Sequence, residues 1–419
     1  MNKINITIYL SCFSMLHCFA QNNASPYSMI GIGDIQQSYF DRSSGMANTG
    51  ISLSSSRFMY HANPASYAKL EDHFFSMEFS ASYRDVTYSG NGVSPLTGRS
   101  ADLSVEKLAL AMKIKSWLGT SIGIMPFSTS NYSFSGTKNI QGSDLTADAV
   151  YEGTGGLNQA YIANAINIKK NLRVGVQTTF LFGNFTQKET LSTDALSITS
   201  TPVVTTAKAY MGKMYFKAGM QYDVKLNKNW GLNLGATASQ KTKLNANYDI
   251  TVADDTGTIA TRETYKSNYF SLPSIYAGGI SFVYKNKLTL SADYQQQLWN
   301  ELQYKGLNYQ LVNSNRISAG IEYAKRVPYM NAVFEKYFLQ TGAYYSNSYL
   351  KIYGQQLQDY GITFGAGFNA KRSQLAYQFS LEIGKRGTTQ NNLIRENYVQ
   401  AGITLLYRDF WFTKVKRFN

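Results

Sequence analysis

The feature of the sequence that most constrains the fold is an alternation of apolar and polar residues with period 2. It recurs from residue 71 almost to the end of the chain. Residues 75–83, FSMEFSASY, are a clear case, because every odd position is apolar or aromatic and every even position is Ser or Glu. Successive side chains of a β-strand point to opposite faces, so such a segment predicts a strand with one apolar and one polar face.

About fourteen segments follow this pattern, an even number, as is usual for bacterial single-chain barrels in membranes. An open sheet of this size would leave unpaired edges, and closing it satisfies the backbone in lipid. The sequence therefore predicts an all-β fold, a transmembrane antiparallel β-barrel over residues 71–419. Its expected strands are centred on residues 75–83, 108–114, 122–124, 162–168, 172–182, 216–224, 230–236, 276–284, 288–294, 317–323, 339–345, 362–368, 375–383 and 399–407.

Composition agrees with such a barrel, although a soluble all-β protein of this size stays open as an alternative. Aromatic residues make up 14% of the chain, with 32 Tyr, while the mean hydropathy is only −0.27. Aromatic girdles and a polar lumen have this composition. The net charge of +14 would usually suggest a nucleic-acid partner. Export from the cytoplasm argues against one, so basic rims facing phospholipid or lipopolysaccharide, or lysines that solvate the turns, explain the charge better.

The first twenty residues have the features of a secretory signal peptide. Lys3 precedes an apolar run from Ile4 to Phe19, and a small-x-small cleavage site ends at Ala20. Cys12 and Cys18 both lie inside this segment, and neither follows a good lipobox. The mature chain is therefore expected to lack disulfides, thiolate catalysis and Cys-ligated metals.

The connections between the expected strands alternate between short and long. Short ones fall at 115–116, 169–171, 227–229, 285–287 and 370–373, with a somewhat longer one at 325–336. Seven long polar stretches lie between them, centred near Gly90, Gly142, Ser192, Asp255, Gln303, Tyr353 and Thr389. Outer-membrane barrels have short periplasmic turns and long extracellular loops. We therefore expect a barrel in the bacterial outer membrane with both termini in the periplasm.

A barrel of about fourteen strands is too wide for wall side chains to fill. Residues 21–70 are the only segment of adequate size without strand or helix periodicity, and they are rich in Gly, Ser and Asn. We expect this segment to be a plug, or hatch, inside the barrel. Asn63, Pro64 and Ala65 should form a turn there, because Pro64 removes a backbone donor and the Asn63 side chain can bond nearby backbone.

Two motifs in this segment, GMANTGIS and HANPASYA, resemble the hatch of the FadL/TodX-like outer-membrane transport family. The resemblance marks Gly45 and Gly50 as hatch glycines and Asn63-Pro64-Ala65 as the hatch motif. In the C-terminal half, LPSIYAGGISFVYKNKLTLSADY and YGITFGAGF resemble the Bacteroidetes branch of the family. The resemblance implies a channel for passive uptake of hydrophobic small molecules such as long-chain fatty acids. The alternative is a non-transporting barrel subunit of an outer-membrane protein assembly or secretion complex.

The third expected strand carries residues that interrupt a β-ladder. Gly119, Gly123 and Pro126 lie in WLGTSIGIMPFSTSNY, and Pro cannot donate to the ladder while Gly weakens it or marks a bulge. The segment is similar to the third strand of the FadL family, whose inward kink implies a lateral outlet for apolar substrates. The alternative is that Pro126 merely lies beyond the membrane-embedded part of the wall.

Nothing in the sequence favours catalysis. Once His17 leaves with the signal peptide, only His61 and His73 remain, and both precede or begin the first strand. No Ser-His-Asp arrangement is then available at the barrel mouth, and two histidines without a carboxylate cluster are more typical of structural roles than of metal ligands. We therefore expect no enzyme activity, no metal and no cofactor. Asp254-Asp255-Thr256-Gly257 lacks the spacing of a calcium loop and predicts an exposed hairpin tip.

Overall fold

The computed structural model describes residues 25–90, 98–139, 146–192, 201–302, 308–329, 332–370 and 374–411. The expected signal peptide, with Cys12, His17 and Cys18, lies outside these residues. No helix in the described residues is long and apolar enough to cross a membrane.

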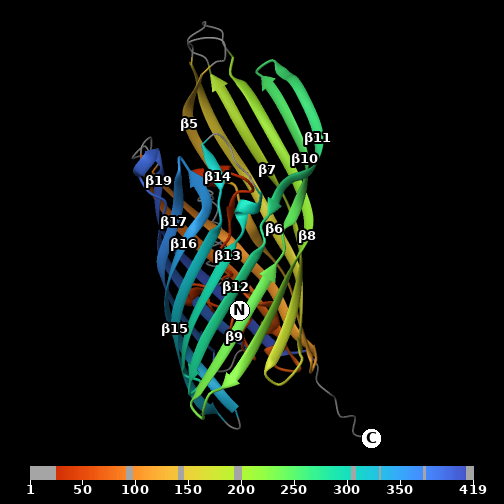
Figure 1. The fold of residues 1–419 in the computed structure, drawn as a ribbon, viewed down its shortest axis with the longest axis vertical. Coiled ribbons are helices and arrows are strands. Elements are labelled where there is room, and N and C mark those ends of the chain that lie inside the picture. Colours follow the sequence, from red (N-terminus) through yellow and green to blue (C-terminus); the bar gives the residue numbers. More distant parts are fainter. Residues whose placement is uncertain are drawn as a thin grey trace, which may run out of the picture.

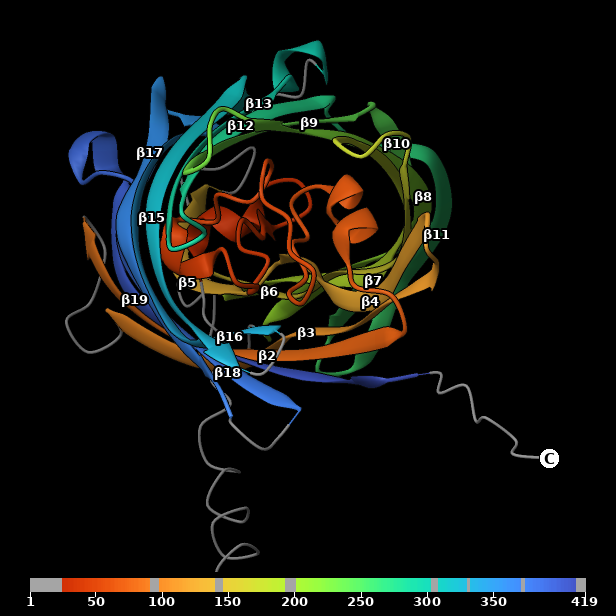
Figure 2. The ribbon, with the colours of Figure 1, turned by 90° about the horizontal axis from the view of Figure 1, so that it is seen from below.

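The described residues form one closed antiparallel β-barrel (Figures 1 and 2). The last strand pairs with the first wall strand, from Ile394 opposite Gly90 to Phe410 opposite Phe74, which closes the sheet. The wall strands are β2 (Phe74–Gly90), β3 (Arg99–Lys115), β4 (Leu118–Thr129), β5 (Tyr132–Asn139), β6 (Thr146–Asn167), β7 (Leu172–Ser192), β8 (Val203–Lys225), β9 (Trp230–Ser239), β10 (Thr242–Asp254), β11 (Gly257–Leu272), β12 (Ile275–Tyr284), β13 (Leu288–Gln297), β15 (Ser314–Tyr329), β16 (Ala332–Ile352), β17 (Gln355–Asn369), β18 (Leu375–Arg386) and β19 (Ile394–Phe410).

Three of the wall strands are interrupted, so each of them appears as two labelled segments in this list. β4 and β5 both pair with β6, β9 and β10 both pair with β8, and β11 and β12 follow each other along β10 and β9. With each interrupted strand counted once, and with the short β1 (Asp34–Ile35) and β14 (Tyr309–Leu311) left aside, the wall has 14 strands. The predicted fold class and strand number are confirmed.

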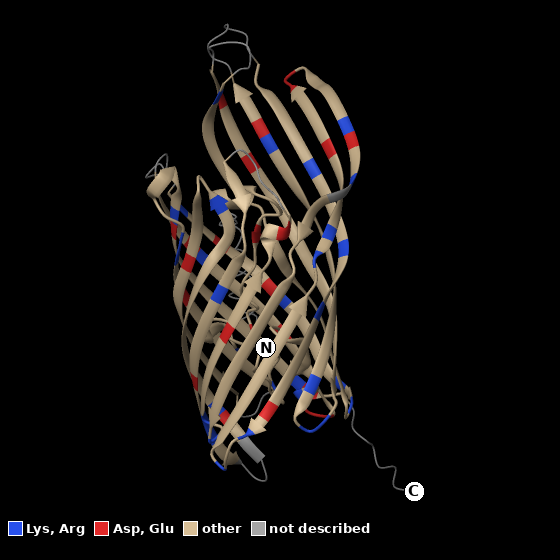
Figure 3. Ribbon diagram, viewed as in Figure 1, with Lys and Arg blue, Asp and Glu red and all other residues tan. Residues whose placement is uncertain are grey.

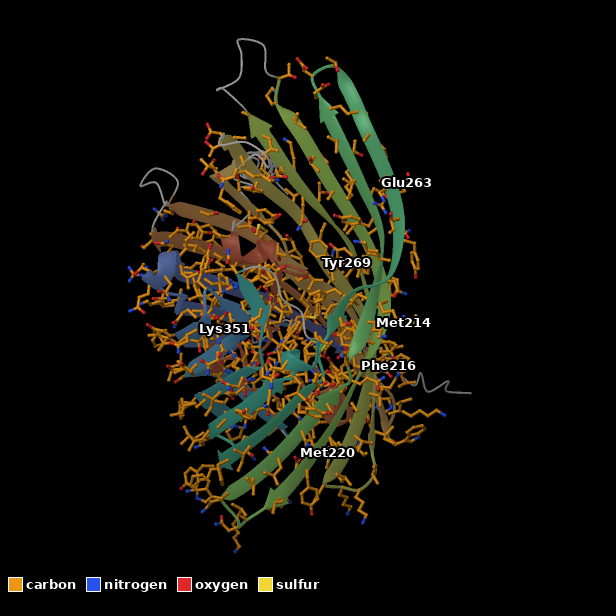
Figure 4. The ribbon with its side chains drawn as sticks, turned by 45° about the horizontal axis from the view of Figure 1, so that its top comes forward. Met214, Phe216, Met220, Glu263, Tyr269 and Lys351 are labelled. Carbon is orange, nitrogen blue, oxygen red and sulfur yellow. The ribbon has the colours of Figure 1, made fainter. Side chains whose placement is uncertain are left out.

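The period-2 pattern separates the two faces of the wall. On β8 the outward side chains of Met214, Phe216 and Met220 are 58%, 47% and 49% exposed, and they lie along the outer side of the barrel (Figure 4). The residue between the first two, Tyr215, faces the lumen and packs on the apolar cluster there. An apolar outer band of this kind is suited to lipid.

The two ends of the barrel differ in height. One end carries short turns, and at the other β6, β7, β8, β10 and β11 rise well beyond the rest of the wall (Figure 1). Several stretches expected to be long loops are therefore partly strand, and β10 and β11 pair up to Asp254 and Gly257. At this exposed tip, hydrogen bonds from the Thr256 hydroxyl and backbone lower the pKa of Asp254. The expected connection at 325–336 is likewise shorter, because β15 runs to Tyr329 and β16 begins at Ala332.

Residues 25–70 lie inside the barrel (Figure 2). They form the short strand β1 and three 3-10 helices, η2 (Pro26–Met29), η3 (Ser44–Met46) and η4 (Pro64–Lys69). We call this segment the hatch. Its first described residue, Ser25, bonds Asn131 and Glu396 near the start of β19, at the end of the barrel opposite Phe410. The expectation that the mature chain begins in the periplasm concerns residue 21, which lies outside the described residues.

Candidate functional site

The Asn63-Pro64-Ala65 turn is seated against the barrel wall near the short-turn end. The Asn63 carboxamide oxygen accepts a hydrogen bond from the Ala65 backbone at 3.0 Å and so caps η4. Its Nδ2 donates to the carbonyls of Ile51, at 2.8 Å, and of Met220 on β8, at 3.0 Å. One side chain thus holds two parts of the hatch together and fixes both to the wall.

A belt of wall glycines receives the hatch backbone. A Cβ on Gly235 would lie 2.1 Å from the Ile51 carbonyl oxygen, and one on Gly219 would lie 2.0 Å from the Asn63 Oδ1 atom. Similar contacts under 3 Å to hatch atoms are met at Gly119, Gly175, Gly279, Gly320, Gly342 and Gly365. The hatch glycine Gly45 faces this belt, since a Cβ added to it would lie 2.5 Å from the Cα of Gly365, whereas Gly50 packs within the hatch against Ala62. Only glycine leaves room for so close an approach of two backbones.

Arg42 clamps the hatch to β15 and β16. Its guanidinium bonds Glu322 at 2.7 Å and Glu335 at 2.6 Å, and its side chain is only 3% exposed. The same group lies 4.2 Å from the ring centres of both Phe58 and Phe338, a cation–π arrangement on each side. Because both carboxylates are largely buried, removing the cation would leave Glu322 without an ion-pair partner among the described residues and would leave Glu335 with Arg326 alone.

Two further polar clamps hold the other sides of the hatch. The Asp293 carboxylate on β13 accepts hydrogen bonds from the backbones of Gly50, at 2.7 Å, and Ile51, at 3.0 Å. On the β2–β3 side, Lys107 pairs with Glu78 at 2.7 Å and donates to the Phe40 carbonyl at 3.0 Å. The hatch is therefore hydrogen-bonded to strands all round the wall rather than to one sector.

The two remaining histidines have the surroundings of structural residues. His61 is buried, with its Nδ1 2.8 Å from the Tyr67 hydroxyl and its Nε2 3.4 Å from Glu78. His73 lies exposed at the entry to β2, where its carbonyl accepts a hydrogen bond from Trp411. Within the described ranges, no three His, Cys, Asp or Glu side chains are grouped closely enough to hold a metal ion.

The upper part of the lumen is filled by the chain itself. Ile30 and Ile32 of the hatch pack into a buried apolar cluster with Phe270, Trp299 and Leu350 from the wall and its connections. Between this cluster and the lower hatch lies a cavity of about 150 Å³. Its lining mixes apolar side chains such as Phe127 and Leu272 with Gln36, Gln159, Lys217 and Arg316.

The wall is interrupted between β3 and β4. The two strands pair from Lys115 and Leu118 only as far as Leu108 and Ile124, and above that point β3 pairs with β2 alone among the described strands. From there the edge of β4 pairs with β1 of the hatch, with Ile35 opposite Ser128. The hatch has therefore taken the place of β3 along this edge.

The residues singled out for a wall kink have three separate positions in this structure. Gly119 contacts the hatch, because a Cβ there would lie 2.1 Å from the Tyr67 carbonyl oxygen. Gly123 still pairs with β3 and lies close to the Tyr161 ring. Pro126 lies beyond the last β3–β4 pair, next to a register shift toward β6.

A second cavity, of about 410 Å³, opens at this interruption. Most of its lining residues are polar, and they include Ser82, Arg84 and Glu106 from β2 and β3, together with Asn158 and Asn184 from β6 and β7. This polar lining was not anticipated, because the resemblance implied an outlet for apolar molecules.

The whole sequence, residues 1–419, matches the model of the BamG family. The chain belongs to the BamG family. This name differs from that of the FadL/TodX family that the hatch motifs resemble. No curated protein matches the sequence.

The fold of this BamG family member is similar to that of solved outer-membrane channels. A FadL homologue from Pseudomonas aeruginosa is 12% identical, with a TM-score of 0.62 and coverage of 91% of this chain and 100% of that one. The P. putida toluene transporter TodX is 14% identical, with a TM-score of 0.56 and coverage of 90% and 100%. The Ralstonia pickettii toluene transporter TbuX is 16% identical, with a TM-score of 0.53 and coverage of 83% and 92%. At these identities the similarity establishes the fold alone.

Proposed function

We propose that this chain is a sealed barrel subunit of an outer-membrane protein assembly or secretion complex. The observation that carries the proposal is that the chain fills its own lumen, with the clamped hatch below and the apolar cluster around Ile32 and Trp299 above. The cavity between the hatch and this cluster, about 150 Å³, is well below the roughly 300–1,000 Å³ of ordinary ligand pockets.

The clamps also oppose movement of the hatch. Withdrawing it would separate Arg42 from two buried carboxylates and would remove both backbone donors from Asp293. Breaking a buried ion pair typically costs about 3–5 kcal/mol. A barrel closed in this way still offers a membrane partner its outer face and both rims, which is what a structural subunit requires.

We further place the short-turn rim in the periplasm and the tall strands outside the cell. Short turns face the periplasm in outer-membrane barrels. This rim also carries exposed lysines that form no ion pair among the described residues, which suits contact with phospholipid headgroups. They are Lys115, Lys169, Lys170, Lys225, Lys228, Lys285, Lys287 and Lys325. Basic residues gather at this rim in Figure 3.

Purification in a mild detergent from the native membrane tests the proposal. The tagged protein should elute with one or more partners in fixed stoichiometry, and the partners should persist across salt and dilution. A tagged barrel of another family from the same membrane, extracted in parallel, is the control for non-specific association. Elution as a lone barrel at every detergent concentration would contradict the subunit proposal.

The second candidate is a passive channel for hydrophobic small molecules, which the interruption beside β3 favours because it offers a way out through the wall. The solved structures of similar fold include toluene transporters. This candidate predicts faster entry of toluene or a long-chain fatty acid into cells that contain the protein than into cells that lack it. Equal entry rates, with the protein shown to be in the outer membrane, would exclude it.

A further inference from the structure

We propose that the opening beside β3 is a binding site for a neutral, hydroxyl-rich group, that is, for a sugar. The site is defined by the cavity of about 410 Å³ where the pairing of β3 with β4 ends. Its volume lies within the roughly 300–1,000 Å³ of small-molecule pockets. The inference holds whether the barrel serves as a complex subunit or as a channel.

The cavity reaches through the wall from the lumen to the outer face. Ser82 and Glu106 line its inner part and are buried, at 3% and 6% exposure. Asn158 and Asn184 line its outer part and are exposed. Asn158 lies on the same face of β6 as the lipid-facing Ile162, four residues along the strand. A molecule in the bilayer or at its surface can therefore present a group to the site without entering the lumen.

The chemistry of the lining favours hydroxyl groups. Ser, Asn and Gln side chains supply both donors and acceptors, and Asp34, Asp102, Glu106 and Glu396 make the lining rich in acceptors. Arg386, behind the lining, pairs with Asp34 at 2.6 Å and lies 3.9 Å from Glu396. Asp102 and Glu106 still outnumber Arg84, the one cationic residue among the described lining residues, so the lining disfavours a phosphate group. Glu106 is held in place by Ser82 and Ser104, each at 2.6 Å, which fixes its acceptor oxygens in the cavity wall.

The outer face next to the cavity suggests that the sugar is the headgroup of a lipid. Leu103 and Val105 project from β3 beside the opening and are 60% and 61% exposed. An amphiphile whose head occupies the cavity can lay its chain along these two side chains, and burial of that chain adds to the affinity. A free oligosaccharide has the same head chemistry without this added contact.

Three probes separate these possibilities in native mass spectrometry of the full-length protein in tetraethylene glycol monooctyl ether. They are dodecyl maltoside, maltose and dodecylphosphocholine, each titrated below the concentration at which it forms micelles. We expect a one-to-one adduct with dodecyl maltoside at a concentration at least tenfold lower than with dodecylphosphocholine, which has the same chain and a different head. Maltose should form the same adduct more weakly.

The matched variants are N158L and N184L at the site and N229L on a short turn remote from it. Each site variant should weaken the dodecyl maltoside adduct about tenfold, while N229L should leave it unchanged, and heat-modifiable gel migration checks that all three fold. Maltose binding as tightly as dodecyl maltoside would support the site but assign it to a free sugar. Equal binding of both dodecyl probes, or unchanged binding in N158L and N184L, would overturn the proposal.

Discussion

Arg42 shows how one side chain can fix the position of the whole hatch. It lies in an irregular segment, while its partners Glu322 and Glu335 belong to β15 and β16. Nothing local in the sequence marks this contact, because Glu322 and Glu335 follow Arg42 by 280 and 293 residues in the chain. Asn63 is different: its use as a backbone-bonding side chain next to Pro64 follows from the residue types, and the structure shows those bonds.

The first prediction concerns this clamp. Substituting Arg42→Gln leaves the buried Glu322 carboxylate without its cation and leaves Glu335 with Arg326 alone, so we expect a loss of about 3–5 kcal/mol in the stability of the seated hatch. The measurement is the urea concentration at which the hatch becomes sensitive to protease in detergent. Arg99→Gln is the matched control, because Arg99 pairs with Asp85 while 73% exposed. Such a surface pair contributes about 0–1 kcal/mol, and equal losses in the two variants would contradict the clamp.

Each wall strand has a lipid face and a lumen face, and the sequence predicts the first better than the second. The alternation of apolar and polar residues predicts each strand because the apolar side chains face lipid, and this pattern can be read from neighbouring residues alone. Which residues occupy the lumen face depends on what packs against it. The local sequence therefore does not predict that glycines in β7, β8, β9, β15 and β16 contact the hatch. The interruptions that divide β9 from β10 and β11 from β12 were missed for the same reason.

The second prediction compares two glycines of β9. A Cβ on Gly235 would lie 2.1 Å from the Ile51 carbonyl oxygen, whereas one on Gly231 meets nothing closer than 3.9 Å. Gly235→Ala should therefore displace the hatch and lower the temperature of the heat-modifiable transition by several degrees. Gly231→Ala should leave it unchanged or raise it slightly, since alanine removes backbone freedom from the unfolded chain. A similar shift in both variants would mean that the hatch does not pack against β9 at Gly235.

At the scale of the whole molecule, the alternation of short and long connections predicted the two unequal ends of the barrel. It did not predict that residues 25–33 would rise to the far end, because their partners Phe270, Trp299 and Leu393 come from distant parts of the chain. The polar cavity beside β3 was missed as well. Its existence depends on β1 replacing β3 along β4, a tertiary contact with no local pattern.

The third prediction tests the proposed orientation. A Cys placed at Asp255, on the tip between β10 and β11, should react with a membrane-impermeant maleimide added to intact cells. A Cys placed at Asn229, in the short turn before β9, should react only after the outer membrane is opened. The expected mature chain has no cysteine, so neither label has a background site. Labelling of the Asn229 position alone in intact cells would reverse the orientation.

The last prediction asks whether the hatch closes the barrel. Deleting residues 21–68 removes η2, β1, η3, nearly all of η4 and Arg42 but leaves every described wall strand and the expected signal peptide in place. The 14-stranded wall should still close, since β19 pairs with β2, and the lower parts of β3 and β4 pair with each other, without help from the hatch, although the deletion leaves the upper edge of β4 without β1. A lumen of this width is then open to water. In planar bilayers the deletion variant should conduct ions steadily while the intact protein stays nearly silent, and Arg42→Gln should show brief openings between these limits. Equal conductance of the intact and deleted proteins would mean that the hatch does not seal the lumen, and the case for a sealed subunit would fail with it.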